Sequence, residues 1–355
     1  MDLQSTATEQ NQNITPLPLY PDAFNTTEWH LVYSIIPPYI FIICLTGISG
    51  NTFVLLVFLF QRSPWNVPEI YLGSLVLADL LFLLCLPFWA INILNYFHWT
   101  YGEVMCKVVN MSIIVNMYSS VYMIAMVNVD RYLALVQTMR ARWFRKKRYA
   151  KVICLVLWLF GFVMSAPVAV HRTIRYIPGL QITACILDYP SNTWRLVHHF
   201  NLILLGFLLP FLVIVFCSCS IIRVLRKRSQ NISIQERNDR KATVLVCAVT
   251  VLFLVCWGPF QVVTFLDILC DYKILDEEVW YHALDIGSQS STYLACLNSC
   301  LNPLLYVCSG QYFRRKVSEM YKRRKISSGS VVTALQRSIV STYLTRRDQT
   351  KPVVI

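Results

Sequence analysis

Long apolar runs separated by short charged segments dominate the pattern of this 355-residue chain. A helix that crosses a bilayer needs roughly 20 mostly apolar residues, and each run reaches that length. Because backbone amides in lipid must be satisfied within the segment, each run is predicted to form a helix. The predicted spans cover about residues 33–60, 69–95, 104–137, 150–170, 196–222, 242–269 and 280–307. The pattern therefore predicts an all-α membrane protein, a bundle of seven transmembrane helices.

Composition supports a membrane location. Apolar residues make up 56% of the chain and charged residues 14%, against about 25% charged residues in an average soluble domain. A soluble globule of this length could not bury so much apolar surface. The net charge of +13 raises nucleic acid as a partner, but the basic residues lie in short blocks between apolar runs. This arrangement is typical of membrane topology, so we expect no nucleic acid and instead contact with anionic membrane lipid.

The distribution of Lys and Arg orients the predicted bundle. Of the 32 basic residues, 25 are Arg62 or lie in the loops 138–149 and 223–241 or after residue 308. Because basic loops remain in the cytoplasm, these segments are predicted to be cytoplasmic and the N-terminus extracellular. Residues 1–32 lack the basic start and apolar core of a cleavable signal peptide, so the first span must direct insertion. We therefore expect a multi-pass protein of the plasma membrane.

The spans and their flanks divide the chain into four parts. We expect an extracellular tail over residues 1–32, the seven-helix domain over 33–310, a short amphipathic cytoplasmic helix over 311–323 and a flexible cytoplasmic tail over 324–355. The extracellular tail contains two N-x-Ser/Thr sequons, which predict glycosylation of Asn13 and Asn25.

Polar residues inside the predicted spans are the first candidates for function, because they are unfavourable in lipid. Asp79 is the carboxylate of the second span, and no Lys or Arg lies at a comparable depth. One interpretation is a set of hydrogen bonds between helices. The other is a small hydrated cavity that holds a cation beside Asp79, since a lone buried carboxylate needs a partner. The polar residues at comparable depth include Asn51, Asn116, Ser119, Ser120, Asn298, Ser299 and Asn302.

Three short motifs lie in the third, sixth and seventh predicted spans. They are Asp130-Arg131-Tyr132, Cys256-Trp257-Gly258-Pro259 and Asn302-Pro303-Leu304-Leu305-Tyr306. Each motif is weak by itself, but the combination resembles the rhodopsin-like G-protein-coupled receptors. The resemblance implies a receptor that couples to a heterotrimeric G protein, with roles in coupling or activation for Asp130, Arg131, Tyr132, Trp257, Pro259, Asn302, Pro303 and Tyr306.

The same resemblance assigns two further sites. In that family, cysteines at the positions of Cys106 and Cys185 form a disulfide that ties the 171–195 loop over the ligand pocket. Without the resemblance the pairing stays open, because a third cysteine, Cys270, also lies at or beyond the outer membrane face, where oxidation is permitted. The family also has an allosteric sodium site, and we expect no other cofactor. Its residues correspond here to Asp79, Asn116, Ser120, Asn298 and Ser299.

Several longer segments narrow the resemblance to the bradykinin receptors, nearer the type-2 than the type-1 members. The matching segments are residues 132–139 (YLALVQTM), 183–187 (TACIL), 206–210 (GFLLP), 240–246 (RKATVLV), 264–267 (TFLD) and 298–307 (NSCLNPLLYV). This resemblance implies a kinin peptide as ligand, signalling through Gq, phospholipase C and calcium release, and regulation by receptor kinases and arrestin.

Acidic residues at the outer ends of the sixth and seventh spans suggest how a kinin would bind. Asp267 and Asp285 lie where these spans emerge. They form either a solvated acidic rim or a binding site for a guanidinium, which binds carboxylates in a bidentate fork. Kinins, the ligands implied by the resemblance, begin and end with Arg. Deeper residues expected to line the path of the peptide are Trp89, Trp257, Phe260, Gln261, Thr264, Gln289 and Tyr293.

Other classes of protein fit this sequence less well. A non-signalling decoy receptor is the main alternative, although the intact Asp130-Arg131-Tyr132 motif argues against it. A receptor for another cationic peptide is a second alternative. A transporter would need a continuous polar path, which the spans do not offer, so it is much less favoured. An enzyme is not expected. An intramembrane protease would need two facing carboxylates or a Ser–His or His–metal set at mid-depth, and the predicted spans contain none of these.

Overall fold

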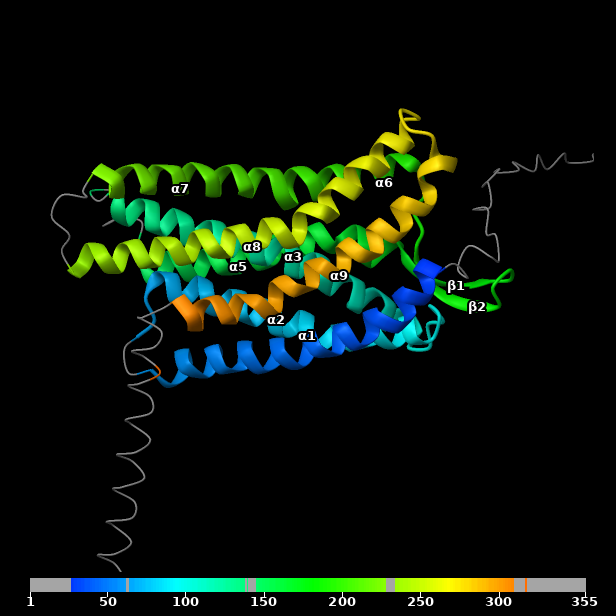
Figure 1. Cartoon of the computed structure of the whole chain (residues 1–355), viewed down its shortest axis with the longest axis horizontal. Helices are drawn as coiled ribbons and strands as arrows, with labels where there is room; N and C mark the ends of the chain where they lie inside the picture. The colour runs from blue at the N-terminus through cyan, green and yellow to red at the C-terminus, as the bar shows by residue number, and fades with distance from the viewer. Residues whose placement is uncertain are drawn as a thin grey trace, which may run out of the picture.

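The computed structural model describes residues 27–61, 64–137, 139, 145–227, 234–309 and 317. Long helices run side by side along one axis, and a β-hairpin lies at one end of the bundle (Figure 1). All seven predicted spans are helical. The helices are α1 (Thr27–Phe60), α2 (Val67–Leu94), α3 (Gly102–Leu135), α5 (Lys147–His171), α6 (Asn192–Ile203), α7 (Leu209–Lys227), α8 (Ile234–Asp271) and α9 (Glu277–Ser309).

Six of the spans are long and apolar enough to cross a membrane by length and composition. In one of them α6 continues through a π-helical turn at Leu204–Leu208 into α7, so these elements form a single span. The exception is α9, which is long enough but carries several buried polar residues, among them Ser291, Asn298, Ser299 and Asn302. These side chains face the interior of the bundle, which explains why the last helix is less apolar overall than its neighbours.

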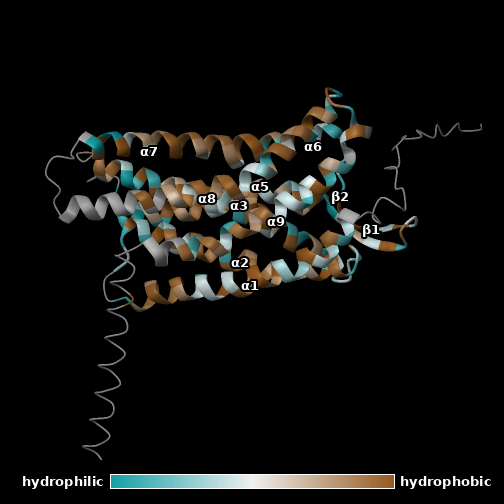
Figure 2. Ribbon diagram, in the orientation of Figure 1, coloured by the Kyte–Doolittle hydropathy of each residue, from teal (hydrophilic) through white to brown (hydrophobic). Residues whose placement is uncertain are grey.

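Buried and exposed positions are distributed as a lipid environment requires. Hydrophobic residues predominate along the length of the helices, while hydrophilic residues gather toward the ends of the bundle (Figure 2). Leu45 and Val104, for example, are each 72% exposed. Polar residues such as Asn51 and Asp79 are fully buried instead. The arrangement satisfies polar groups inside the bundle and leaves apolar groups for lipid contact.

The π-helical turn illustrates how a proline is accommodated inside a span. Pro210 follows this turn and lacks the N–H that would continue the helical hydrogen bonds. The hydroxyl of Tyr122 in α3 donates a 2.8 Å hydrogen bond to the Leu205 carbonyl oxygen. Tyr118 likewise donates a 3.1 Å bond to the Asn201 carbonyl oxygen. A neighbouring helix therefore satisfies carbonyls near the proline, as expected for prolines in membrane helices.

The hairpin consists of β1 (Arg172–Ile177) and β2 (Ile182–Leu187), which pair in antiparallel register. The sequence pattern predicts only a loop over residues 171–195 and no strand there. The strands are six residues each, and a strand pair this short gives little periodic signal. A 2.7 Å hydrogen bond from the Trp99 N–H to the Thr183 carbonyl attaches β2 to the segment between α2 and α3. The hairpin is thereby fixed against the helical bundle.

Some predicted features lie outside the described residues. These are the glycosylation sites Asn13 and Asn25, nearly all of the predicted amphipathic helix over 311–323, and the tail over 324–355. Tyr306 lies within α9, but its side chain is outside the described part.

Candidate ligand pocket and polar core

A pocket of about 450 Å³ opens between the helices at the hairpin end. Its volume is within the range of about 300–1,000 Å³ that is usual for ligand sites. Arg172 of β1 and Leu187 of β2 contribute to its wall, so the hairpin borders the pocket. The helices supply the remainder of the wall, and α6, α8 and α9 provide most of its polar residues.

Six of the nine predicted ligand residues line this pocket: Trp89, Phe260, Thr264, Asp267, Asp285 and Gln289. The other three, Trp257, Gln261 and Tyr293, do not line the described part of the pocket. Trp257 is 4% exposed and meets Phe260 edge to face at 6.0 Å between ring centroids. Gln261 is buried, with its amide nitrogen 3.9 Å from the Met117 sulfur. Tyr293 donates a 2.8 Å hydrogen bond to the Gln289 side-chain oxygen. Trp257 and Tyr293 thus contact residues of the wall, Phe260 and Gln289.

The pocket also contains cationic residues that sequence reasoning missed. Arg195 of α6 forms an ion pair with Asp271 of α8, whose side chain is only 4% exposed. Asp267 has its Oδ2 3.4 Å from His199 Nδ1. Among the described residues, no Lys or Arg forms an ion pair with Asp285. The mouth is therefore not uniformly acidic: Asp271 pairs with Arg195 through its Oδ1, whereas neither Asp267 nor Asp285 forms an ion pair with a described Lys or Arg.

Arg172 places a positive charge on the hairpin side of the pocket. Its guanidinium donates a hydrogen bond to the Asn110 side-chain oxygen, and its Nε is buried without a partner. Burial lowers the pKa of Arg172 from its usual value to about 10. The guanidinium is still protonated at neutral pH, because that pKa lies well above 7. Arg172 therefore offers a cation to an anionic group of a ligand.

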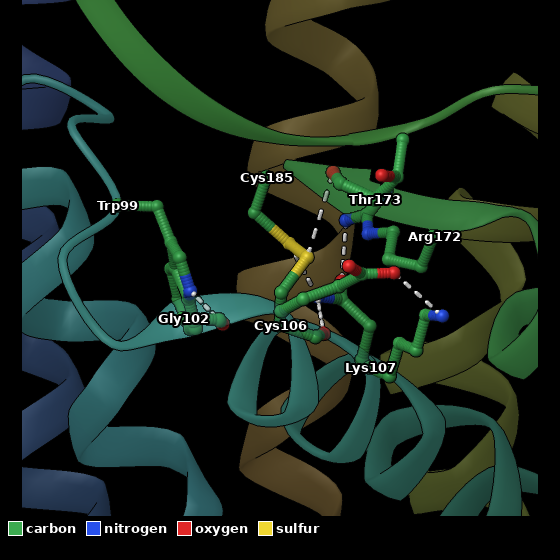
Figure 3. Close-up of a disulfide and its surroundings, with 9 residues drawn as sticks. Trp99, Gly102, Cys106, Lys107, Arg172, Thr173 and Cys185 are labelled. Carbon is green, nitrogen blue, oxygen red and sulfur yellow. Dashed lines mark hydrogen bonds and ion pairs between the residues drawn. A yellow bond between two sulfur atoms is a disulfide. The ribbon is translucent and has the colours of Figure 1, made fainter. Parts of the chain in front are cut away.

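A disulfide joins Cys106, in the second turn of α3, to Cys185 in β2 (Figure 3). The Cα atoms are 5.8 Å apart, which is within the usual range for a disulfide. The predicted pairing is confirmed. Asn110, which borders the pocket, also lies beside this bond, with its side-chain nitrogen 3.4 Å from the Cys185 sulfur. The disulfide therefore holds the hairpin directly against the pocket wall.

The polar core around Asp79 joins three helices. Its Oδ1 accepts hydrogen bonds from Asn116 at 2.9 Å, Ser120 at 3.5 Å and Ser299 at 2.7 Å. Its Oδ2 accepts a 3.1 Å bond from Asn302, which the sequence analysis placed in the activation set instead. Asn298, which directly precedes Ser299, is also buried, but neither its side-chain nitrogen nor its side-chain oxygen has a hydrogen-bond partner among the described residues. The structure thus brings together four of the five predicted sodium-site residues and adds Asn302.

The polar side chains of this core are of the type that binds a hard cation. Asp79 is fully buried, and no Lys or Arg in the described part of the chain pairs with it. The side-chain oxygens of Asn298 and Asn302 are buried and have no hydrogen-bond partner among the described residues. Buried oxygens without donors are rare in native proteins and require an explanation. A carboxylate with several oxygen-bearing neighbours is the type of donor set that hard cations prefer.

At the opposite end of α3, Asp130 is buried and bound by a residue that sequence reasoning did not single out. Arg145, just before α5, donates hydrogen bonds of 2.8 and 3.1 Å to its two carboxylate oxygens. Arg131 has a buried Nε that finds no hydrogen-bond partner among the described residues. Tyr132 packs against Phe216, with ring centroids 5.6 Å apart. The basic loop thus does more than orient the chain, because one of its arginines ties the end of α3 to the start of α5.

Comparison with known proteins gives a consistent result. Residues 50–306 match the family described as 7 transmembrane receptor (rhodopsin family). The B2 bradykinin receptor of Oryctolagus cuniculus is 42% identical over 313 residues, which cover 87% of this chain and 85% of that protein. The B2 bradykinin receptor of Cavia porcellus is 44% identical over 305 residues, covering 85% and 82%. The B1 bradykinin receptor of Homo sapiens is 40% identical over 327 residues, covering 91% of each chain.

Proposed function

Because the chain belongs to the rhodopsin family of seven-transmembrane receptors, we propose that it is a receptor for a kinin peptide with an extracellular N-terminus. Membership of this family makes it a multi-pass protein of the plasma membrane that couples to a G protein. The observation that carries the ligand assignment is the pocket at the hairpin end, where Asp267 and Asp285 line one cavity. The similarity to bradykinin receptors supports the same ligand class.

The charges of the pocket suit a peptide that has a cationic end and a terminal carboxylate. Asp267 and Asp285 are suited to a guanidinium, which binds carboxylates in a bidentate fork. Arg172, on the hairpin side of the same pocket, is suited to a carboxylate. A kinin begins with Arg and ends with a carboxylate, so it supplies both complements. A small amine would match only the acidic side.

Binding would act by shifting the balance between two arrangements of the helices, because a ligand with equal affinity for both shifts nothing. Phe260 links the pocket to the buried Trp257, and Pro259 weakens α8 between them. Movement of α8 would open the cytoplasmic end beside Arg131.

We further propose that the receptor signals through Gq, phospholipase C and calcium release. The basic loops would contact anionic membrane lipid. Receptor kinases and arrestin would bind the cytoplasmic tail.

The ion pair between Arg145 and Asp130 is expected to favour the inactive arrangement. Replacing Arg145 by Ala removes both hydrogen bonds to the buried carboxylate and should raise basal signalling. A pair that is partly exposed contributes at most about 1 kcal/mol, which corresponds to about a fivefold change in the equilibrium. Ligand-independent inositol phosphate accumulation at matched surface expression measures the effect. Lys151→Ala, at an exposed basic residue of α5, is the matched control, and equal basal signalling in both variants would contradict the expectation.

We propose that the polar core around Asp79 holds a sodium ion that lowers agonist affinity. Asp79, Asn116, Ser120, Ser299 and Asn302 would supply the ligands, and the ion would neutralise the buried carboxylate. Asp79→Asn keeps the shape of the side chain and removes its charge. We expect kinin binding to be weakened by sodium relative to choline in the wild-type receptor but not in this variant. Competition binding in the two salts measures the difference, and unchanged sodium sensitivity in Asp79→Asn would overturn the assignment.

Calcium release in cells that lack endogenous kinin receptors tests the proposed function. Cells that express the chain are treated with a kinin, with a kinin lacking its first Arg and with an unrelated cationic peptide. The proposal expects the full kinin to be the most potent of the three. Kinin binding without calcium release or any other G-protein response would instead identify a decoy receptor. A response only to the unrelated peptide would identify a receptor for another cationic peptide.

A further inference from the structure

The mouth of the pocket contains a cluster of which the kinin proposal uses only one member, Asp267. It consists of His199 on α6 and of Asp267 and Asp271 on α8, and we name it the mouth triad. One ligand atom from each side chain lies within 4.8 Å of the other two. Imidazole nitrogen and carboxylate oxygen are the ligand atoms that Zn²⁺ takes in proteins. We propose that the mouth triad binds Zn²⁺ and thereby ties α6 to α8.

The contact between His199 and Asp267 has the spacing of two zinc ligands. His199 Nδ1 is 3.4 Å from Asp267 Oδ2, and this nitrogen is buried without a hydrogen bond. The distance exceeds the usual range of about 2.7–3.2 Å for a hydrogen bond between N–H and oxygen. Two atoms bound at about 2.1 Å to a tetrahedral zinc ion lie about 3.4 Å apart. The separation therefore fits joint binding of one ion better than a direct hydrogen bond.

Asp271 supplies a second, independent observation. Its side chain is 96% buried, since only 4% of it is exposed. Its Oδ1 pairs with Arg195, but its Oδ2 is buried and has no hydrogen-bond partner in the described part of the chain. A buried carboxylate oxygen without a partner is unfavourable. A cation within the triad would satisfy this oxygen.

The mouth triad and Arg195 together form two pairs of residues, one on α6 and one on α8, that face each other. Arg195 and His199 are four residues apart on α6, and Asp267 and Asp271 are four residues apart on α8, so each pair shares one helix face. Arg195 competes with the ion, because its positive charge already pairs with Asp271. Three protein ligands would leave the fourth zinc position open to water. Removal of Arg195 should therefore strengthen zinc binding.

Thermal unfolding of the full-length chain tests this proposal without any peptide. The protein is purified in detergent without a histidine tag, and its melting temperature is followed during titration with ZnCl₂ or MgCl₂. A ligand that binds only the folded state raises the melting temperature increasingly as its concentration exceeds the dissociation constant. We expect stabilisation that grows with the logarithm of the Zn²⁺ concentration and none by Mg²⁺, because Mg²⁺ is bound poorly by histidine.

Four variants locate the site. His199→Phe and Asp271→Asn should each weaken the apparent zinc affinity at least about tenfold, since even the loss of residues that only support zinc ligands has that effect. His282→Ala, at an exposed histidine of α9, should leave the affinity unchanged. Arg195→Gln should increase it. Wild-type zinc affinity in Asp271→Asn together with no gain in Arg195→Gln would overturn the proposal, even if His199→Phe fails to fold. Because no kinin is present, the outcome is independent of the kinin assignment.

Discussion

Replacing Asp267 or Asp285 by Ala should weaken kinin binding at least about tenfold, because each charge-assisted hydrogen bond contributes roughly 1.5–3 kcal/mol. Both side chains line the same pocket, and neither pairs with a Lys or Arg in the described part of the chain. If they share one guanidinium, the double variant should lose less than the product of the two single effects, because groups that bind one partner are coupled. Competition binding against a labelled kinin measures all three variants.

The shortened peptide and a matched acidic residue make this experiment specific. A kinin that lacks its first Arg should lose little affinity in either single variant, because the group held by the carboxylates is absent. Asp276→Ala, at an exposed acid between α8 and α9, should bind the full kinin as the wild type does. A chelator in the buffer removes any contribution of zinc at Asp267. Wild-type affinity in both single variants would show that Asp267 and Asp285 are only a solvated rim. Equal losses for the two peptides would show that the carboxylates act without contacting that Arg.

Loss of the disulfide between Cys106 and Cys185 is expected to have the second large effect. The bond closes a loop between residues 79 positions apart and holds β2 against α3. Removal of a native disulfide usually costs about 2–5 kcal/mol. Cys185→Ser should therefore lower the melting temperature and abolish high-affinity kinin binding, because the hairpin that borders the pocket is released. Thermal unfolding and saturation binding on the same preparation measure both effects.

Cys85→Ser is the matched control for the disulfide. Cys85 is a free, half-buried thiol that packs in the same apolar cluster as Cys106. Its replacement removes a sulfur atom from the same region without releasing the hairpin. We expect binding close to that of the wild type. If Cys185→Ser binds kinin as tightly as Cys85→Ser, the disulfide does not position the pocket.

The helical architecture could be predicted because each apolar run is long enough to specify a span by itself. The span boundaries follow the same signal, although α1 begins at Thr27 and the first predicted span at residue 33. The hairpin could not be predicted in the same way, because two strands of six residues carry too few positions for a clear period. Its placement depends instead on the disulfide and on the contact between Trp99 and Thr183.

The candidate site was predictable where residue type alone restricts the chemistry. A carboxylate within a span, such as Asp79, requires polar partners wherever the helices meet. The identity of each partner depends on how far the helices are displaced along one another, which the sequence does not encode locally. Asn298 and Asn302 lie four residues apart on the same face of α9, and only Asn302 donates to Asp79.

Ion pairs at the two ends of the bundle were missed for a related reason. Arg145 was counted only as a basic residue of the loop 138–149, and Arg195 was not considered. Neither has its acidic partner close in the sequence. Arg145 pairs with Asp130, and Arg195 pairs with Asp271. Arg195 and His199 share a helix face that leads to the pocket, and their spacing of four residues was a signal that could have indicated a polar cluster.

Equilibrium binding of a radiolabelled kinin to membranes that contain the unmodified chain tests the central claim most directly. The account predicts saturable binding at a single class of site. An unlabelled kinin should displace the label fully, and a kinin lacking its first Arg should do so at least about tenfold less potently, because it forgoes the contacts with Asp267 and Asp285. The absence of saturable binding, or equal displacement by the full and the shortened peptide, would contradict a kinin receptor whose acidic mouth recognises the first Arg of its ligand.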